Sequence, residues 1–215
     1  TRRKQGYRAH SIKIGDDPIT NAARIEASLA DRRTGEFFLV DANGGLSVES
    51  ALRMLRRLPA RLDFVLEAPC ATWRECISLR RRTDIPIIWD ELATTEASLS
   101  RIIAEDAADG IGLKITKNGG LTRGRRQRDM CIAAGYTISV QDTTGSDIAF
   151  AAIVHLGQTV PPKFLRCVLE CRDVTNKKTA TGDFTDGMIT APNEPGLGIS
   201  PIKEALGHPV DRYGR

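Results

Sequence analysis

The stretch Phe37-Phe38-Leu39-Val40-Asp41 is a short apolar run that ends in a carboxylate, and the same form recurs along the chain. Short runs rich in aliphatic and β-branched residues are typical of buried strands. Similar runs that each end in Lys, Asp or Glu occupy residues 10–13, 37–41, 64–67, 86–90, 111–114, 136–142 and 164–170. The pattern therefore predicts a series of buried strands, each with a charged residue at its end.

The segments between these runs have helical spacing, as in the apolar positions Val48, Leu52, Leu55 and Leu58. The charged strand ends recur every 23 to 28 residues, which is the length of one strand-helix unit. Repeated units of this kind form an open doubly wound sheet or a closed barrel. No glycine-rich phosphate turn follows the first run, and charged strand ends are typical of the catalytic face of a barrel. We expect an α/β fold of the (β/α)₈ TIM type.

A complete barrel of this type has eight strands, and the sequence offers seven runs. Residues Thr1 to Gly6 resemble a basic helix end with a glycine cap. We therefore expect residues 1–180 to supply strands 2 to 8 of the barrel, with the first strand outside this sequence. The Gly- and Pro-rich residues 181–215 are expected to form loops, with a final short helix near Ile202 to Gly207.

Composition limits the classes of partner. The 215 residues carry a net charge of +4, but the Arg and Lys residues are spread over many predicted helices, which argues against nucleic-acid binding. No apolar run approaches the ~20 residues of a membrane helix. The five cysteines form no Cys-x-x-Cys pair, and no secretion signal is recognised, so we expect reduced thiols in a cytoplasmic protein.

Three carboxylates end successive strands: Asp41, Glu67 and Asp90. Neighbouring parallel strands lie ~4.8 Å apart, so these groups can point at one hard cation, and oxygen ligands suit Mg²⁺. The alternative is that each acid caps the helix that follows its strand. Three in a row with lysines on either side favour the metal site.

Lys13 and Lys114 end strands on the two sides of this acidic arc. Removing a proton from the carbon next to a carboxylate needs a positioned base and a cation that stabilises the product. A structural ion pair with a strand-end acid is the alternative for each lysine, and taken singly the two interpretations are even.

At these residues the sequence resembles the enolase superfamily, in its muconate-lactonizing subgroup. The matching pieces, in order, are Ile12-Lys13-Ile14-Gly15, Val40-Asp41-Ala42-Asn43, Leu66-Glu67-Ala68-Pro69, Trp89-Asp90-Glu91, residues 113–120 and Pro195-Gly196-Leu197-Gly198.

The resemblance implies Mg²⁺ on Asp41, Glu67 and Asp90, and Lys13 and Lys114 as acid/base groups on opposite faces of a small carboxylate substrate. It implies that Asn43 contacts substrate or supports the first ligand. It also implies an N-terminal capping domain, which lies outside this sequence, with residues 181–215 returning to it. Relatives are often homo-oligomers.

One position departs from the subgroup pattern, because Ser11 stands where Lys-x-Lys has its first lysine. Polar and acidic residues at later strand ends, among them Asp142, Thr143 and Glu170, suit a substrate with a cationic nitrogen. Together, Ser11 and these strand-end residues resemble the branch of the superfamily that acts on proline derivatives. The expected reaction is dehydration of cis-3-hydroxy-L-proline by a lyase, with Ser11 also in the substrate pocket. The alternatives are racemisation or epimerisation of a proline betaine or other amino-acid derivative, and a degenerate barrel that only binds.

Overall fold

The computed structural model describes residues 2–15, 17–143, 145–169, 177–181, 187–211 and 213. Within these residues the strands form one parallel seven-stranded sheet whose spatial order follows the chain. The strands are β1 (Ala9–Lys13), β2 (Phe37–Asp41), β3 (Val65–Glu67), β4 (Ile87–Trp89), β5 (Gly110–Lys114), β6 (Thr137–Gln141) and β7 (Leu165–Leu169). All seven predicted strands are confirmed, with ends that differ by one residue at most positions. Glu170 lies outside the described residues.

Helices alternate with the strands, as the period predicted. They are η1 (Arg2–Gln5), α1 (Pro18–Leu29), α2 (Val48–Leu55), α3 (Trp73–Arg80), α4 (Glu96–Ala104), α5 (Ile115–Asn118), α6 (Leu121–Ala134), α7 (Asp147–Gln158) and α8 (Lys203–Leu206). Several begin at a polar N-cap: Thr72 and Glu75 form a capping box at α3, and Asp17 accepts the Thr20 N–H at α1. The predicted helix end near the N-terminus is the short 3₁₀ helix η1, and the predicted final helix is α8.

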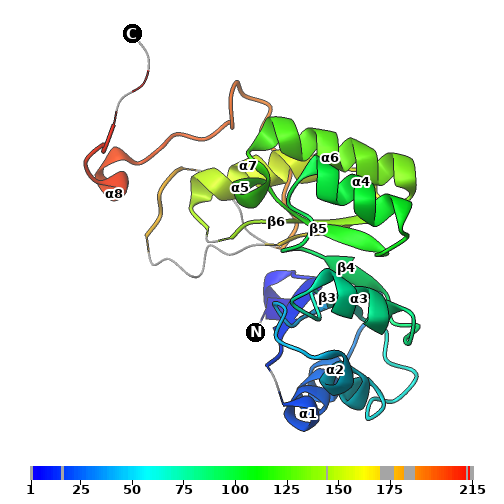
Figure 1. Cartoon of the computed structure of the whole chain (residues 1–215). Coiled ribbons are helices and arrows are strands. Elements are labelled where there is room, and N and C mark those ends of the chain that lie inside the picture. Colours follow the sequence, from blue (N-terminus) through cyan, green and yellow to red (C-terminus); the bar gives the residue numbers. More distant parts are fainter. Residues whose placement is uncertain are drawn as a thin grey trace.

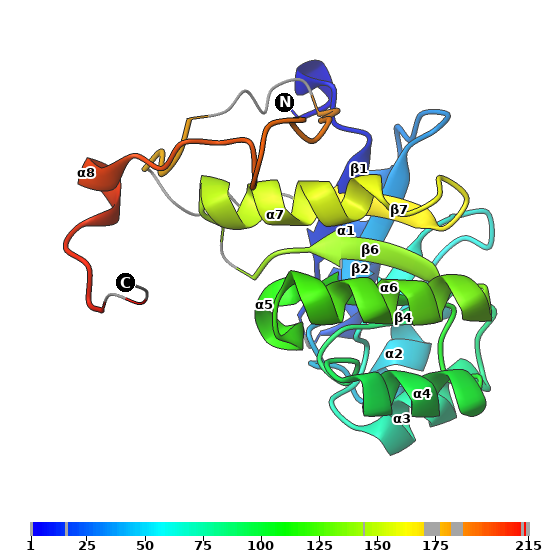
Figure 2. The ribbon, with the colours of Figure 1, turned by 90° about the horizontal axis from the view of Figure 1, so that it is seen from above.

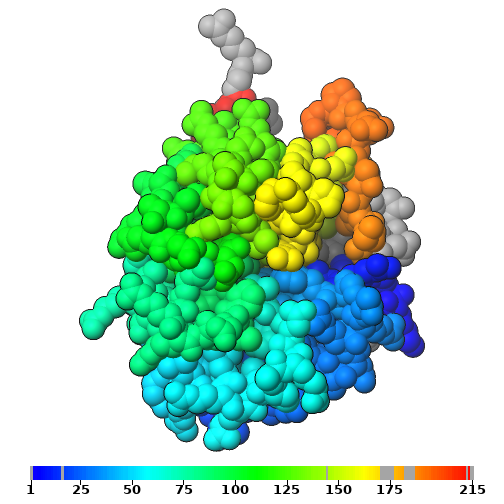
Figure 3. Space-filling view, turned by 90° about the vertical axis from the view of Figure 1, so that its right-hand side faces the viewer, coloured from blue at the N-terminus to red at the C-terminus, as the bar shows by residue number. Residues whose placement is uncertain are grey.

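The sheet curls so that its first and last strands approach each other, with the helices on its outer side (Figures 1 and 2). Among the described residues, no backbone ladder joins β1 to β7. The larger apolar core fills the space between sheet and helices, and a smaller cluster of Leu39, Val65 and Ile88 fills the inside of the curve. This two-sided burial is that of a TIM-type barrel. Figure 3 shows the blue-to-cyan half of the chain packed beneath the green-to-yellow half on one face.

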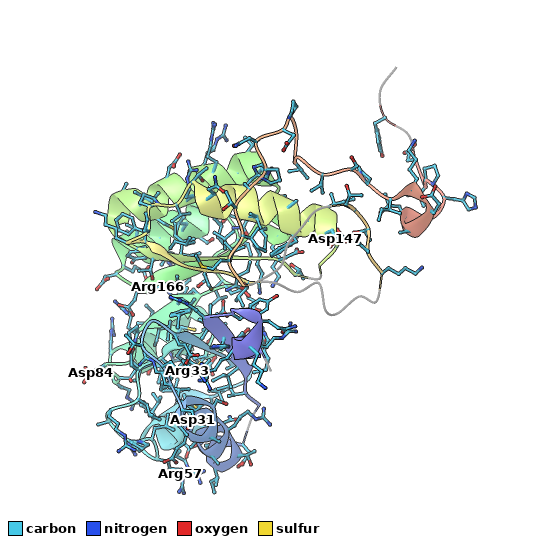
Figure 4. The ribbon with its side chains drawn as sticks, turned by 180° about the vertical axis from the view of Figure 1, so that it is seen from behind. Asp31, Arg33, Arg57, Asp84, Asp147 and Arg166 are labelled. Atoms are coloured by element: carbon cyan, nitrogen blue, oxygen red, sulfur yellow. The ribbon has the colours of Figure 1, made fainter. Side chains whose placement is uncertain are left out.

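The segment after β7 is hydrogen-bonded to the barrel near the start of α7. The Asp147 carboxylate accepts hydrogen bonds from the backbone N–H groups of Thr179 and Ala180, at 2.7 and 3.3 Å (Figure 4). Beyond this point α8 extends away from the helical layer (Figure 1), and Val210 and Tyr213 are exposed. No helix in the described part of the chain has the length and apolarity needed to cross a bilayer.

Candidate active site

The strand register brings the predicted site residues to one edge of the sheet. Lys13 lies opposite Asp41, and Asp41 lies opposite Glu67, in the ladders that join β1, β2 and β3. Asp90 directly follows β4, which pairs with β3 on one side and β5 on the other. Lys114 ends β5 and lies opposite Gln141 of β6. These side chains therefore share the carboxyl edge, where barrel enzymes carry their chemistry.

The three acids form a buried arc with Glu67 at its centre. Asp41 and Asp90 are each 2% exposed, and Glu67 is fully buried. Burial, together with repulsion from Asp41 and Asp90, raises the pKa of Glu67 from 4.5 to about 8. The strand ladder places Asp41 opposite Glu67, and Asp90 follows the next strand, so both outer acids lie near the central one. This crowding costs stability unless a cation or protons neutralise the arc.

Lys13 flanks the arc at the β1 end. Its ammonium donates hydrogen bonds to Asp41 Oδ2 and, at 2.9 Å, to Asn43 Oδ1, and its side chain is 62% exposed. The Asn43 N–H in turn donates to Asp41 Oδ1 at 2.8 Å. Asn43 therefore orients both the acid and the lysine, and it adopts a positive φ of 45° to do so.

Lys114 flanks the arc at the β5 end and is buried. Its ammonium donates to Asp90 Oδ2. Burial alone would lower the pKa of Lys114, but the bond to Asp90 and the charges of Glu67 and Glu91 outweigh it and raise this pKa. Burial also raises the pKa of Asp90, and the bond from Lys114 only partly offsets that rise. Burial penalises the charged form of both groups, so it raises the pKa of Asp90 and opposes the rise in the pKa of Lys114. We favour a charged Lys114, since several carboxylates surround it.

Gln141 and Gly112 pack against Glu67 from inside the barrel and leave room for its carboxylate. Glu67 Oε1 accepts a hydrogen bond from Gln141 Nε2 at 2.5 Å, while Glu67 Oε2 is buried and has no hydrogen-bond partner among the described residues. Gly112 lies beneath this pair, and a Cβ there would come within 2.6 Å of Glu67 Oε1. An unpartnered buried carboxylate oxygen among three acids is the kind of donor that a hard divalent cation takes.

Within the described residues, no three His, Cys, Asp or Glu side chains are already gathered into a cation-binding group. Both outer acids are instead bonded to lysines. The donor set fits Mg²⁺ in type and order, provided that the lysines release Asp41 and Asp90. The metal ligands thus stay a prediction.

Lys117 and Glu91, to which the sequence analysis assigns no role, also lie at this site. Lys117, on α5, places its ammonium 3.9 Å from Asp90 Oδ2 and 3.6 Å from Glu91 Oε1. Glu91 Oε1 also accepts from Asn43 Nδ2 at 3.3 Å, which links the two sides of the site. Gln141, which directly precedes Asp142 at the end of β6, is a further site residue. The signal that identifies it is the alternation of Ser139 and Gln141 along β6, which turns both inward.

The predicted substrate contacts are distributed around this edge. Ser11 is exposed and lies two residues before Lys13 on β1, so both face the same side of the sheet. Asp142 is buried, accepts the Thr143 N–H at 2.7 Å, and has a pKa raised by that burial. The Thr143 hydroxyl is 2.6 Å from that of Thr116, beyond Lys114. Glu170 lies outside the described residues. The substrate-binding roles of these residues stay predictions.

A small cavity of about 180 Å³ lies beside the arc, with Asn43, Trp89 and Asp90 in its wall. A larger hollow of about 470 Å³ is lined by Arg80, Pro86 and Asp109. Pro86 precedes β4 and Asp109 precedes β5, so the larger hollow is at the opposite edge of the sheet from the lysines. The larger hollow is therefore not the candidate site.

Comparison with known proteins gives consistent matches over nearly the whole chain. The family model described as "Enolase C-terminal domain-like" matches residues 1–205. Cis-3-hydroxy-L-proline dehydratase of Roseibium aggregatum is 38% identical over 211 residues, which cover 97% of this chain and 57% of that enzyme. A probable glucarate dehydratase of Streptomyces coelicolor is 25% identical over 94% of this chain and 47% of its own length. The chain thus spans about half the length of these curated relatives.

Solved structures agree in fold. A crystal structure of a candidate mandelate racemase/muconate lactonizing enzyme from Aspergillus oryzae is 65% identical, with a TM-score of 0.94 over 98% of this chain and 59% of that one. A similar candidate from Roseovarius nubinhibens, complexed with magnesium, is 51% identical, with a TM-score of 0.95 over 99% of this chain and 60% of that one.

Proposed function

Because the chain belongs to the enolase superfamily, we propose that its protein removes the α-proton of a carboxylate substrate with the help of Mg²⁺, and that the substrate is cis-3-hydroxy-L-proline. The observation that carries the proposal is the placement of Lys13 and Lys114. Each contacts one outer acid of the arc, from opposite sides of Glu67. The 38% identity to a dehydratase of this substrate supports the choice of substrate.

Asp41, Glu67 and Asp90 are the residues that would hold the cation. The magnesium-complexed relative and the unpartnered Glu67 oxygen support this assignment. Bound there, Mg²⁺ would attract the substrate carboxylate and stabilise the negative charge that develops when the α-proton leaves. The hydrogen bond from Gln141 orients Glu67, and the absence of a side chain at Gly112 leaves room for this pair.

The two lysines suit the stereochemistry of this substrate. In the cis isomer the 3-hydroxyl is on the same ring face as the carboxylate, so the α-hydrogen is on the opposite face. A base on one face and an acid on the other can therefore remove the proton and assist departure of the hydroxyl. One lysine Nζ takes the α-proton, and the other donates a proton to the leaving oxygen as water. The enamine that results tautomerises to a pyrroline.

Ser11 distinguishes the two lysines. A second lysine at this position would repel the Lys13 ammonium, and a serine cannot. Lys13 is instead oriented by Asp41 and Asn43. Ser11, on the same face as Lys13, leaves room and a hydroxyl for the substrate. The acidic end of β6 at Asp142 suits the ring nitrogen, which is cationic at neutral pH.

The test is incubation of the protein with cis-3-hydroxy-L-proline and Mg²⁺ in heavy water, followed by NMR. We expect a pyrroline product and its loss in Lys13→Ala and Lys114→Ala. The exposed Lys163→Ala, before β7, is the matched control and should retain activity. Substrate recovered with deuterium and inverted configuration would replace the dehydratase by an epimerase. Failure of both reactions, with no exchange of the α-hydrogen, would reject proton abstraction from this substrate.

A further inference from the structure

Two cysteines share the wall of the small cavity beside the acidic arc. Cys70 follows β3 by three residues, Cys76 is in α3, and both line the 180 Å³ space that also contacts Asp90. They are 3% and 1% exposed, and both are free thiols. Neither takes part in the chemistry proposed above.

Local geometry brings these thiols together. Thr72 is the N-cap of α3, so Cys76 is the fourth residue of the helix and Cys70 lies two residues before the cap. Helical side chains lean toward the N-terminus, which aims Cys76 at the turn that holds Cys70. Cys76 Sγ is 3.4 Å from the Cys70 carbonyl oxygen. The two thiols interact closely enough for each to shift the pKa of the other.

We propose that Cys70 and Cys76 form a reversible disulfide and that this pair is a redox modification site in the wall of the active-site cavity. The inference does not depend on the substrate or reaction proposed above. It rests on two neighbouring thiols and on a cavity that contains them both. The exposed residues Ala71 and Glu91 also line that cavity, which gives a small oxidant a route to the sulfurs.

The reaction is a two-electron oxidation. Hydrogen peroxide reacts with one thiolate to give a sulfenic acid and water, and the second thiol then displaces a second water as the S–S bond forms. Peroxide is thus reduced to two waters while two S–H bonds are lost. The interaction with the Cys70 thiol lowers the pKa of Cys76, and the same interaction raises the pKa of Cys70. Cys76 is therefore the attacking thiolate and Cys70 the resolving thiol.

Other cysteines provide an internal comparison. Cys131 and Cys167 are buried, and burial raises the pKa of each to about 12. Neither lines the cavity. Because peroxide reacts with the thiolate form, it should oxidise Cys70 and Cys76 and leave Cys131 and Cys167 unmodified.

The crosslink would stiffen a loop that already supports the site. Cys70 forms an isolated antiparallel bridge with Gly45, and Gly44 donates to the Ala68 carbonyl at 2.7 Å. These contacts tie the loop after β3 to the loop after β2, which carries Asn43. Trp89 lines the same cavity and is fully buried, so its fluorescence should report the change.

The test is to treat the protein with hydrogen peroxide, unfold it in urea with iodoacetamide, and digest it with trypsin. Cys70 falls in the peptide 62–74 and Cys76 in the peptide 75–80, because Arg61, Arg74 and Arg80 are cleavage sites. We expect these peptides to be joined with the loss of two hydrogens and separated again by dithiothreitol. Cys131 and Cys167 should remain alkylated. The protein should run as a monomer on a non-reducing denaturing gel, and Trp fluorescence should shift with the same time course.

Recovery of both peptides in the alkylated form after oxidation would overturn the proposal. So would a link from either cysteine to another peptide or to a second copy of the chain. Cys70→Ser should abolish the link and leave Cys76 as a sulfenic acid that dimedone traps. If Cys70→Ser leaves Cys76 unreactive toward dimedone while the protein keeps its native fluorescence, Cys76 is not the attacking thiol and the mechanism is overturned.

Discussion

The amide of Gln141 donates a 2.5 Å hydrogen bond to Glu67 across the inside of the barrel, although the two residues are 74 positions apart in the chain. The bond joins β6 to β3 and lowers the pKa of Glu67, against the larger effect of burial that raises it. In the part of the chain that the structure describes, Glu67 Oε2 has no hydrogen-bond partner, so the bond from Gln141 orients the central acid of the arc. Stability and site geometry therefore depend on the same contact.

Gln141→Leu should destabilise the protein by about 1–3 kcal/mol, because it leaves a buried carboxyl oxygen without its donor. Urea unfolding at neutral pH measures the change. The Glu67→Leu background supplies the control, since there the carboxyl that needs a donor is already gone and Gln141→Leu should cost less. Equal costs in the two backgrounds would show that the contact does not contribute.

Gly112→Ala should cost about 1–3 kcal/mol by overpacking, because the new Cβ would come within 2.6 Å of Glu67 Oε1 and 3.1 Å of Gln141 Nε2. Gly15→Ala is a matched control in the loop after β1, where a Cβ meets nothing within 4 Å. Unfolding midpoints in urea should fall for the first variant and stay near that of the native protein for the second. If Gly112→Ala leaves the urea midpoint unchanged, the packing around Glu67 and Gln141 is looser than the structure indicates.

The strands and their charged ends could be predicted, because buried strands are short apolar runs and the 23–28-residue period places their ends at one edge. The contact between Gln141 and Glu67 could not, since it joins strands that are not neighbours and depends on how far the sheet curls. The ion pairs of Lys13 and Lys114 with Asp41 and Asp90 correspond to the alternative that the sequence left open.

Depth of burial was also less predictable than pattern. The apolar positions Val48, Leu52 and Leu55 of α2 do pack on the core, but they are only partly buried. The deepest residues of that helix are Ala51 and Met54. A helical period of 3.6 residues gives a broad apolar stripe along the helix. Which side of this stripe faces the sheet depends on the angle at which the helix crosses the strands, and the local sequence does not encode that angle.

Magnesium should stabilise the native protein, and Glu67→Gln should abolish this effect, because an amide supplies a weaker ligand at the centre of the arc. The measurement is the thermal midpoint with and without millimolar MgCl₂ after treatment with a chelator. Glu26→Gln, on the exposed side of α1, is the control and should keep the full magnesium shift. A native protein whose midpoint does not respond to magnesium would contradict the assignment of Asp41, Glu67 and Asp90 as ligands.

The loss of folding stability at acid pH should depend on Glu36, which directly precedes β2 and binds Arg3 of η1. Its carboxylate accepts from Arg3 Nε at 2.5 Å and from the Arg33 N–H at 2.8 Å. The bond from Arg3 is the main cause that lowers the pKa of Glu36 from 4.5 to about 2. A carboxyl with a lowered pKa in the folded state stabilises that state fully above its unfolded pKa and loses the effect as the pH falls toward the folded pKa. The native protein should therefore exceed Glu36→Gln in urea midpoint by a constant amount above about pH 5. This difference in urea midpoint should narrow between pH 4.5 and about 2.

The control is Glu26→Gln, whose urea midpoint should not converge with that of the native protein as the pH falls. If the difference between the native protein and Glu36→Gln stays constant throughout the acid range, the Glu36 ion pair does not stabilise the fold.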